Sequence, residues 1–276
     1  MTLAAAVTRG GRKALPPPLS LRGQLLPLGN AALGIGLLLA LWWLGGWVIA
    51  SNPATANFAG FAPGPAFAQL WRLVAGGDLW STMLPSLGRI GGGMAWAILL
   101  GVPLGIAIGR IPAVRNLTHV PFQFLRMISP LSWMPIAVLS FASWDAAIVF
   151  LIAAAAVWPV TFATANGIRK IDPAWFKVAR NLGARSWQML AQIILPAAAQ
   201  DVLTGIRLAL GTAWVVLVPA EYLGVTSGLG YAINDARDTL EYDRLAAIVV
   251  VIGAVGFLLD WICLTLIKRY SWTREG

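Results

Sequence analysis

Charged residues are scarce in this sequence of 276 amino acids. They make up 11% of the chain, whereas hydrophobic residues make up 58% and the mean hydropathy is +0.75. A soluble domain carries about 25% charged residues, so this chain has too few groups to cover a surface that faces water. We therefore predict an integral membrane protein.

Cysteine and histidine occur once each, as Cys263 and His119. One residue of each type excludes a disulfide within the chain and a metal site built from these ligands. The sequence also lacks G-x-x-x-x-G-K-[ST], the loop that binds ATP phosphates, and the metalloprotease pattern H-E-x-x-H. No G-x-S-x-G sequence supports an intramembrane serine enzyme. We predict no catalytic residue, no metal ligand and no cofactor bound by this chain itself.

Long apolar runs are what the sequence has in place of charge. A helix needs about 20 residues to cross a bilayer, and six runs qualify when a marginal length or one ionisable residue is admitted. Pro130 and Pro135 are predicted to break the third span, at about 120–141, because proline removes a backbone hydrogen-bond donor. We predict an all-α polytopic protein with six spans, built on these runs: 31–50, 90–109, 127–144, 146–168, 208–220 and 245–267.

The excess of basic residues follows the predicted topology. The net charge is +9, and 14 of the 20 lysines and arginines fall in segments that are cytoplasmic if the N-terminus is inside. This bias is the positive-inside rule, so it places both termini in the cytoplasm and argues against a nucleic-acid partner. We predict a flexible basic tail at 1–30, a single transmembrane domain at 31–276 and a short amphipathic helix at 65–74 on the outer side.

A polar, basic loop at about 169–196 separates two apolar runs. Asp172 and Pro173 are typical of an N-cap followed by a first-turn proline. Apolar residues then recur at intervals of three to five residues, and Gly183 permits a sharp turn. The pattern predicts a short helix, a turn at Gly183-Ala184 and the start of a second helix.

The stretch KVARNLGARSWQMLAQIILP, at 177–196, resembles the cytoplasmic coupling loop of ABC importer permeases. That pattern reads E-A-A, three residues, G, nine residues, I-x-L-P, and Gly183, Ile193 and Pro196 match it. The sequence departs at Lys177, where the family has Glu, and at the next residue, where valine replaces the first Ala. The resemblance implies that the loop couples this chain to a separate ATPase, with a docking surface of Trp175, Val178 and Leu182. The coupling residues are Trp175, Lys177, Val178, Ala179, Leu182, Gly183 and Ala184.

The resemblance extends over about 65–267, to permeases of the nitrate, sulfonate, taurine and bicarbonate branch. It rests on SPLSWMP (129–135), PAEYLG (219–224) and SGLGY (227–231). It implies a type I ABC importer permease fold in the bacterial inner membrane, working by alternating access. The implied partners are two ATPase subunits that bind ATP and Mg, a second permease copy forming a homodimer, and a periplasmic or lipid-anchored substrate-binding protein.

Within this branch, SPLSWMP and the run at 145–160 are closer to nitrate or bicarbonate permeases. The sequence therefore favours import of a small inorganic anion, nitrate first, with nitrite, bicarbonate or cyanate also open. One alternative is a sulfonate or taurine permease. Another, from a different class, is a stand-alone secondary transporter, which would show paired inverted halves.

Three arginines, Arg89, Arg126 and Arg207, fall inside predicted spans. A charge there costs about 2.5–3.5 kcal/mol on insertion scales, so each needs a partner or a water-filled path. A path lined with cations suits a small anion, and hydroxyl groups would replace part of its hydration shell. The predicted substrate path comprises Arg89, Arg126, Ser129, Ser132, Trp133, Thr161, Arg207 and Glu221.

These arginines also have a structural interpretation. Arg207 would pair with Asp201 or Asp260. Arg89 would pair with Glu221, which would then brace the outer gate. Both interpretations stay open from the sequence.

Overall fold

The computed structural model describes residues 21–272, with side chains described for 29–269. The chain divides into two compact units, Met1–Pro63 and Gly64–Gly276. The first unit holds helix α1 (Leu21–Ser51) and the short 3-10 helix η1 (Ala56–Phe61). Within it, Trp42 Nε1 donates a hydrogen bond to the carbonyl of Phe61 at 2.8 Å. Helix α1 begins ten residues before the predicted span, and residues 1–20 of the predicted tail lie outside the described residues.

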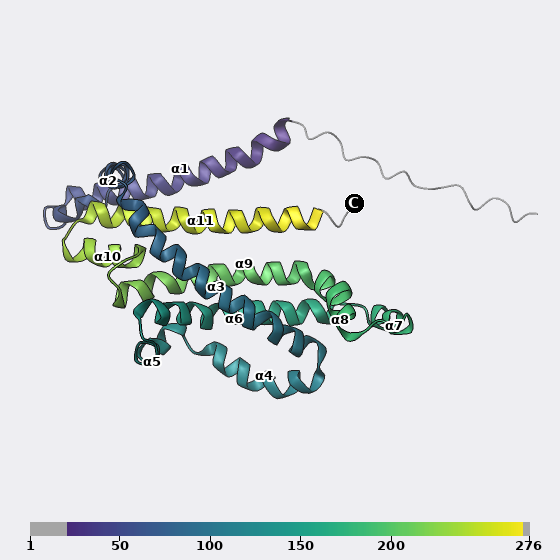
Figure 1. Ribbon diagram of the computed structural model, residues 1–276. Helices are drawn as coiled ribbons and strands as arrows, with labels where there is room; N and C mark the ends of the chain where they lie inside the picture. The colour runs from purple at the N-terminus through teal and green to yellow at the C-terminus, as the bar shows by residue number, and fades with distance from the viewer. Residues whose placement is uncertain (1–20, 273–276) are drawn as a thin grey trace, which may run out of the picture. The chain divides into compact units, whose positions relative to one another are not determined.

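All regular secondary structure described in the second unit is helical, and turns or short loops join the helices (Figure 1). Its long helices run between two ends, which we name the α10 end and the α7 end after the short helices found there. Its elements are α2 (Pro63–Gly76), α3 (Asp78–Arg110), α4 (Pro112–Met127), η2 (Pro130–Trp133), α5 (Met134–Ser140), α6 (Trp144–Arg169), α7 (Pro173–Asn181), α8 (Ser186–Met189), η3 (Leu190–Ile194), α9 (Leu195–Gly224), α10 (Leu229–Asp238) and α11 (Tyr242–Trp272).

Helices α3, α6 and α9 form the centre of this unit, with α6 packed between the other two. Small residues allow the close approach: a Cβ added at Gly105 of α3 would lie 2.6 Å from the carbonyl oxygen of Thr161. Likewise, a Cβ added at Gly205 of α9 would lie 3.0 Å from the carbonyl oxygen of Pro159. Such small-residue contacts are how helices associate in lipid, where burial of apolar surface gives no driving force. The α6 helix is thereby held as the rigid axis of the unit.

The third predicted span is not a straight helix. Five helices of the described chain are long and apolar enough to cross a membrane, and the sixth crossing is a pair, Pro112–Met127 and Pro130–Ser140, bent by 87°. The bend falls at Ile128 and Ser129, directly before Pro130. The residue before a proline is held away from helical geometry, and this explains why the break precedes the first proline of SPLSWMP.

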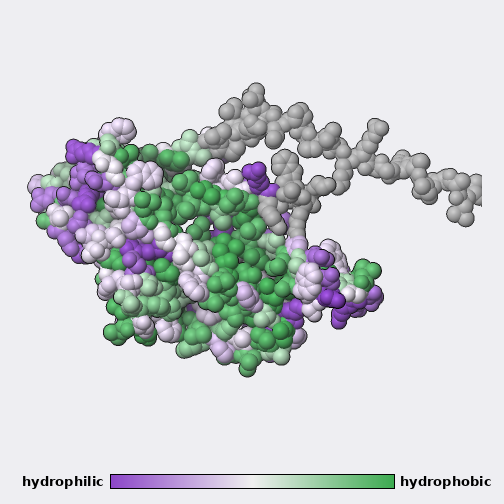
Figure 2. Space-filling model, viewed as in Figure 1, coloured by the Kyte–Doolittle hydropathy of each residue, from purple (hydrophilic) through white to green (hydrophobic). Residues whose placement is uncertain are grey.

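The amphipathic helix predicted at 65–74 is confirmed as α2. In this helix, Leu70 and Leu73 pack against α10 and α11, whereas the side chains of Phe67 and Trp71 are exposed. Elsewhere the exposed surface is apolar over the mid-length of the long helices of the second unit, and hydrophilic residues gather at its α7 and α10 ends (Figure 2). An apolar band of this kind is typical of a multi-pass membrane protein.

Candidate functional site

The loop at the α7 end has the predicted helix–turn–helix form. Asp172 caps α7, and its carboxylate accepts a hydrogen bond from the backbone N–H of Ala174 at 2.8 Å. The helix ends at Asn181, and Gly183 follows the C-cap Leu182 with φ of 76°, the left-handed conformation that glycine adopts at least cost. Two backbone bonds close the end, from Ala184 N–H to the carbonyl of Ala179 and from Gly183 N–H to that of Arg180, both at 3.0 Å. This pair is a Schellman motif, which fixes the turn.

The inner side of this loop packs against the C-terminal end of α6 and the N-terminal end of α9. Ala179 and Met189 are buried in a cluster with Ile168 of α6 and Ala198 of α9. Ala179, one of the predicted coupling residues, therefore lies on the inner side of α7. Ala184 is half-buried against the same cluster. These two alanines anchor the loop, because larger side chains would lift α7 away from α6.

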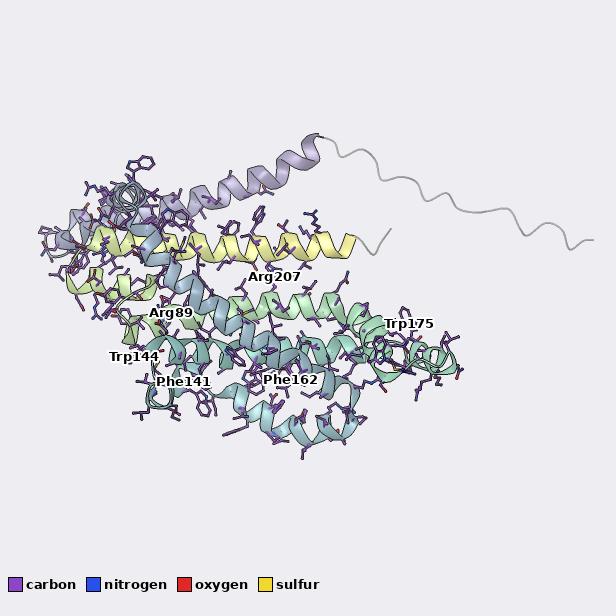
Figure 3. The ribbon with its side chains drawn as sticks, viewed as in Figure 1. Arg89, Phe141, Trp144, Phe162, Trp175 and Arg207 are labelled. Carbon is purple, nitrogen blue, oxygen red and sulfur yellow. The ribbon has the colours of Figure 1, made fainter. Side chains whose placement is uncertain are left out.

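The outer side of α7 is exposed and apolar. Trp175, Val178 and Leu182 are 59%, 57% and 81% exposed, and Lys177 beside them is also exposed. Figure 3 shows Trp175 at the tip of the α7 end. Trp187 of α8 is exposed as well and was not among the residues predicted for contact, although its position in the motif stretch could have indicated it. Apolar side chains held on a capped, anchored helix form a surface suited to a protein partner.

The loop is joined to α9 without a break. Residues Leu190–Ile194 form one π-helical turn, and Pro196 lies in the first turn of α9. The span from Ser186 to Gly224 is therefore one element of 39 residues. Ile194 is fully buried at the junction. A displacement of the loop would thus move α9 as well. This continuity explains why the pattern includes both the glycine turn and the I-x-L-P residues at the start of α9.

A buried ionic cluster lies at the α10 end of α3 and α9. Arg89 Nη1 and Glu221 Oε1 are 2.6 Å apart, with 6% and 0% of their side chains exposed. Glu221 also accepts hydrogen bonds from Ser86 Oγ at 2.8 Å and from the backbone N–H of Gly230 at 3.0 Å. The alternative pairing of Arg89 with Glu221 is confirmed. Both side chains are enclosed by protein, so neither faces an open path.

The same cluster holds the loop before α10 in place. Arg89 donates to the carbonyl and the hydroxyl of Ser227, both at 2.8 Å, and to Asp145 of α6 at 2.7 Å. Gly228 has φ of 106°, and a Cβ added there would lie 2.5 Å from a Glu221 oxygen. The glycines of SGLGY are therefore required because the chain crosses directly over the carboxylate. One arginine thus joins α3, α6, α9 and the loop into α10.

Arg207 of α9 is also paired. Its Nε and Nη2 atoms bind the two carboxylate oxygens of Asp260 of α11 at 2.7 and 2.8 Å, so the pair is bidentate. Asp201, the other partner considered from the sequence, instead pairs with Lys170 at 2.5 Å. Arg207 is 37% exposed and lies at mid-length of its helix, facing α11 (Figure 3). Two of the three intramembrane arginines are therefore neutralised by carboxylates.

Arg126 differs from the other two arginines. Among the side chains described at 29–269, no carboxylate pairs with it, and its guanidinium lies over the ring of Phe162, 5.4 Å from the centroid. Arg126 is exposed in the last turn of α4, directly before the 87° break. Ser129 and Ser132 are exposed in and after the break, and Trp133 is half-buried. The structure thus brings four of the predicted path residues to one bend.

Thr161 does not join them. Its side chain is fully buried against α3, and its Oγ1 atom has no hydrogen-bond partner among the described residues. The close contact at Gly105 leaves it no open surface. Thr161 was predicted to line the path because a hydroxyl group in a span can bind an anion. Packing between the helices decides which face of the helix a hydroxyl group occupies, and the sequence does not indicate it.

The geometry agrees with comparisons to known proteins. Residues 97–272 match the model of the family described as binding-protein-dependent transport system inner membrane component. The chain belongs to this family. The permease is 38% identical over 186 residues to the bicarbonate transport system permease protein CmpB of Synechococcus elongatus, and 35% identical over 182 residues to the taurine transport system permease protein TauC of Escherichia coli.

These relatives confirm the branch that the motifs indicate. The two matches cover 67% and 66% of the permease and 66% of each relative, so the permease spans just under two thirds of their lengths. A solved structure titled as inward-facing conformations of the MetNI methionine ABC transporter has a TM-score of 0.57 at 15% identity, over 70% of the permease and 95% of that chain. This similarity shows the fold alone, and it confirms the predicted ABC importer permease architecture.

Sequence reasoning missed three members of the ionic cluster in the permease: Ser86, Asp145 and Ser227. A signal was present for Ser86, which precedes Arg89 by three residues and so shares its helix face. Asp145 and Ser227 lie 56 and 138 residues from Arg89. Nothing local in the sequence indicates contacts over such separations.

Proposed function

We propose that this permease is the pore-forming subunit of an ATP-driven importer for a small anion. The observation that carries the proposal is the α7 loop, an exposed apolar surface on a capped helix that is continuous with the span α9. A pore subunit without an ATP-binding loop needs such a contact, because the work of transport must be delivered by another protein. The family match and the relatives named as permeases support the same role.

The proposed assembly contains two copies of the permease, two ATPase subunits that bind ATP and Mg, and a substrate-binding protein. Its α7 end and both termini lie in the cytoplasm, and its α10 end faces the binding protein. The distribution of basic residues supports this orientation, since Lys177, Arg180 and Arg185 all lie at the α7 end. Exposed apolar side chains along the long helices leave surface for both lipid and a second copy.

Transport in this proposal proceeds by alternating access. When the ATPase subunits close on ATP, they move the two α7 loops together, and each loop carries its α9 helix with it. The ionic cluster of Arg89 and Glu221 keeps the α10 end of α3, α6 and α9 rigid during this movement. The bend between α4 and α5 then lies where the two copies enclose the path.

Arg126 is the residue we assign to the anion. Because it has no carboxylate partner among the described side chains, its charge is available, whereas Arg89 and Arg207 are neutralised. The exposed hydroxyls of Ser129 and Ser132 stand beside it as hydrogen-bond donors. Nitrate, favoured from the sequence, and bicarbonate or taurine, named for the relatives, all carry one negatively charged group that suits this set.

Anion-stimulated ATP hydrolysis tests the proposal. The complex of permease, ATPase and binding protein is reconstituted in vesicles, and hydrolysis is measured with nitrate, nitrite, bicarbonate, cyanate, taurine and a longer alkanesulfonate in turn. We expect one class of small anion to raise the rate several-fold and neutral amino acids to leave it unchanged. Stimulation by a cation or a neutral solute, with none by any of the anions, would contradict the proposed substrate class.

A further inference from the structure

A cavity of about 500 Å³ opens at the α7 end, between α7 and the ends of α3 and α6. Half of the residues that line it are basic, and no acidic residue is among them. The ten lining residues are Gly109, Arg110, Arg115, Ile168, Arg169, Ile171, Pro173, Phe176, Lys177 and Arg180. Five cations around one cavity produce a positive potential that low-dielectric walls would concentrate.

None of these five cations has a carboxylate partner among the side chains described at 29–269. Elsewhere in the same part of the chain, carboxylates do pair with cations: Arg89, Lys170, Arg207 and Arg244 each form an ion pair. The absence of acids is therefore local to this cavity. Like charges gathered without counter-ions repel one another, so the arrangement is stabilised by an anion that binds there.

Two of the cations are held in position by one residue, Phe176. The Arg110 guanidinium lies over the Phe176 ring at 5.1 Å, and its Nη2 atom contacts Met189 Sδ at 3.0 Å. Arg180 donates from Nε to the Phe176 carbonyl at 3.2 Å. The end of α3 and the α7 helix are thereby linked through Phe176, with the remaining guanidinium N–H groups left to bind a ligand. Preorganised guanidinium groups bind phosphate oxygens through paired hydrogen bonds.

The cavity lies where the apolar surface ends. Arg110 and Arg169 are the last residues of α3 and α6, and Arg115 is half-buried in the first turns of α4. Cations at helix C-termini are favoured by the helix dipole, which explains Arg110 and Arg169 but not the other three. Ile111, which follows Arg110 and caps α4, and Leu117, two residues after Arg115 on α4, are exposed apolar residues. Charged groups at the cavity and apolar residues beside it match the two parts of a phospholipid.

We propose that this cavity binds the phosphate headgroup of an anionic phospholipid, whose acyl chains lie along α4. Basic pockets between helices at the cytoplasmic side of a membrane are suited to such headgroups. A soluble phosphate would offer the same oxygens to the same guanidinium groups, without the acyl chains. The bound headgroup joins α7 to α3, α4 and α6, and so stabilises the loop that contacts the ATPase.

Lipid binding is measured on the full permease chain by native mass spectrometry, after reconstitution with phosphatidylcholine alone or with added phosphatidylglycerol. We expect phosphatidylglycerol to be retained about tenfold better than phosphatidylcholine. The double variant Arg115→Gln/Lys177→Gln should lose that preference. The control Arg72→Gln/Arg185→Gln removes the same charge from exposed residues outside the cavity and should keep it. If the double variant does not fold, the exposed single variant Lys177→Gln should lower the preference by about threefold.

Four outcomes would overturn the inference. Equal retention of the two lipids would show that the cavity does not select an anionic headgroup. Equal loss of the preference in the control and cavity variants would show that the cations act only through overall charge. A second arm adds inorganic phosphate to permease in phosphatidylcholine and records its melting temperature. If phosphate stabilises the wild-type permease as much as phosphatidylglycerol does, the ligand is a soluble anion. If the cavity variant weakens ATPase co-purification but leaves phosphatidylglycerol binding intact, the cavity belongs to the ATPase contact.

Discussion

At the scale of single residues, the arginines divide by their partners. Arg89 is buried with Glu221, and its guanidinium group links α3, α6, α9 and the loop before α10. Arg126 is exposed at a helix break with no described carboxylate partner. A buried charge that loses its partner is strongly destabilising, whereas an exposed charge is not. Substitutions in the Arg89–Glu221 pair should therefore lower stability, whereas substitution of Arg126 should lower transport and leave stability nearly unchanged.

Replacing Glu221 tests the structural half of this division. Glu221 accepts hydrogen bonds from Ser86, Arg89 and Gly230, all through carboxylate oxygens. Glu221→Gln would turn an amide N–H₂ group toward one of these donors, and we expect a loss of about 3 kcal/mol in the free energy of unfolding. Asp145→Asn is the matched control, because that side chain is 68% exposed and its loss should cost about 1 kcal/mol or less. Equal melting temperatures for the two variants would contradict the account.

Replacing Arg126 tests the other half. Arg126→Ala removes the unpaired cation at the bend, so we expect anion uptake by the assembled complex to fall by about tenfold or more. Arg126→Lys keeps a charge but not the fork of N–H groups, and should retain part of the activity. Complex assembly and melting temperature should stay near those of the wild type, since the side chain is exposed. Undiminished uptake with unchanged anion preference in the alanine variant would remove Arg126 from the path.

At the scale of elements, the α7 loop combines a fixed turn, an anchored inner side and an apolar outer side. The Trp175→Ala/Leu182→Ala variant removes the most exposed part of that outer side. We expect ATPase affinity to fall by about a hundredfold, because buried aromatic anchors dominate protein interfaces. Trp71→Ala, a 72% exposed tryptophan on α2, is the control and should leave affinity unchanged. Binding measured in detergent would refute the assignment if both variants bound equally well.

The sequence predicted this loop well because its signals are local. Asp172, Pro173 and Gly183 each act on the backbone within a few residues, and the structure has the cap, the first turn and the left-handed glycine where they indicate them. The third span was predicted in part, since the break expected at Pro130 is present. Its apolar run has the length of a span, but the sequence does not indicate the angle between the two helices on either side of the break. In the structure that angle is 87°.

Contacts between residues far apart in the sequence were predictable only for ion pairs, because few carboxylates are available to pair with an arginine inside a span. A buried arginine needs an acid, so Arg89 with Glu221 and Arg207 with Asp260 could be named from the sequence. The helix faces of Thr161 and Ala179 could not be predicted from the sequence, because small or hydroxyl residues are tolerated on either face of a helix. Only the packing against Gly105 and Met189 decides that both are buried.

At the scale of the whole molecule, the permease has three features on which the proposed function depends. Its α7 loop continues into α9, its α10 end is fixed by the ionic cluster, and its bend at Ser129 is open at the surface. These parts work together only if another protein moves the loop and a second copy covers the bend. The central claim is therefore that transport by this chain is driven through α7 by separate ATPase subunits.

Uptake of labelled anion into vesicles tests that claim most directly. The permease is reconstituted alone, with ATPase and binding protein, and with the same partners but the Trp175→Ala/Leu182→Ala variant in place of the wild type. We predict uptake only in the complete wild-type system with ATP, and a loss of at least about tenfold in the variant. Uptake by the permease alone, driven by an ion gradient without ATP, would contradict the claim and identify a secondary transporter.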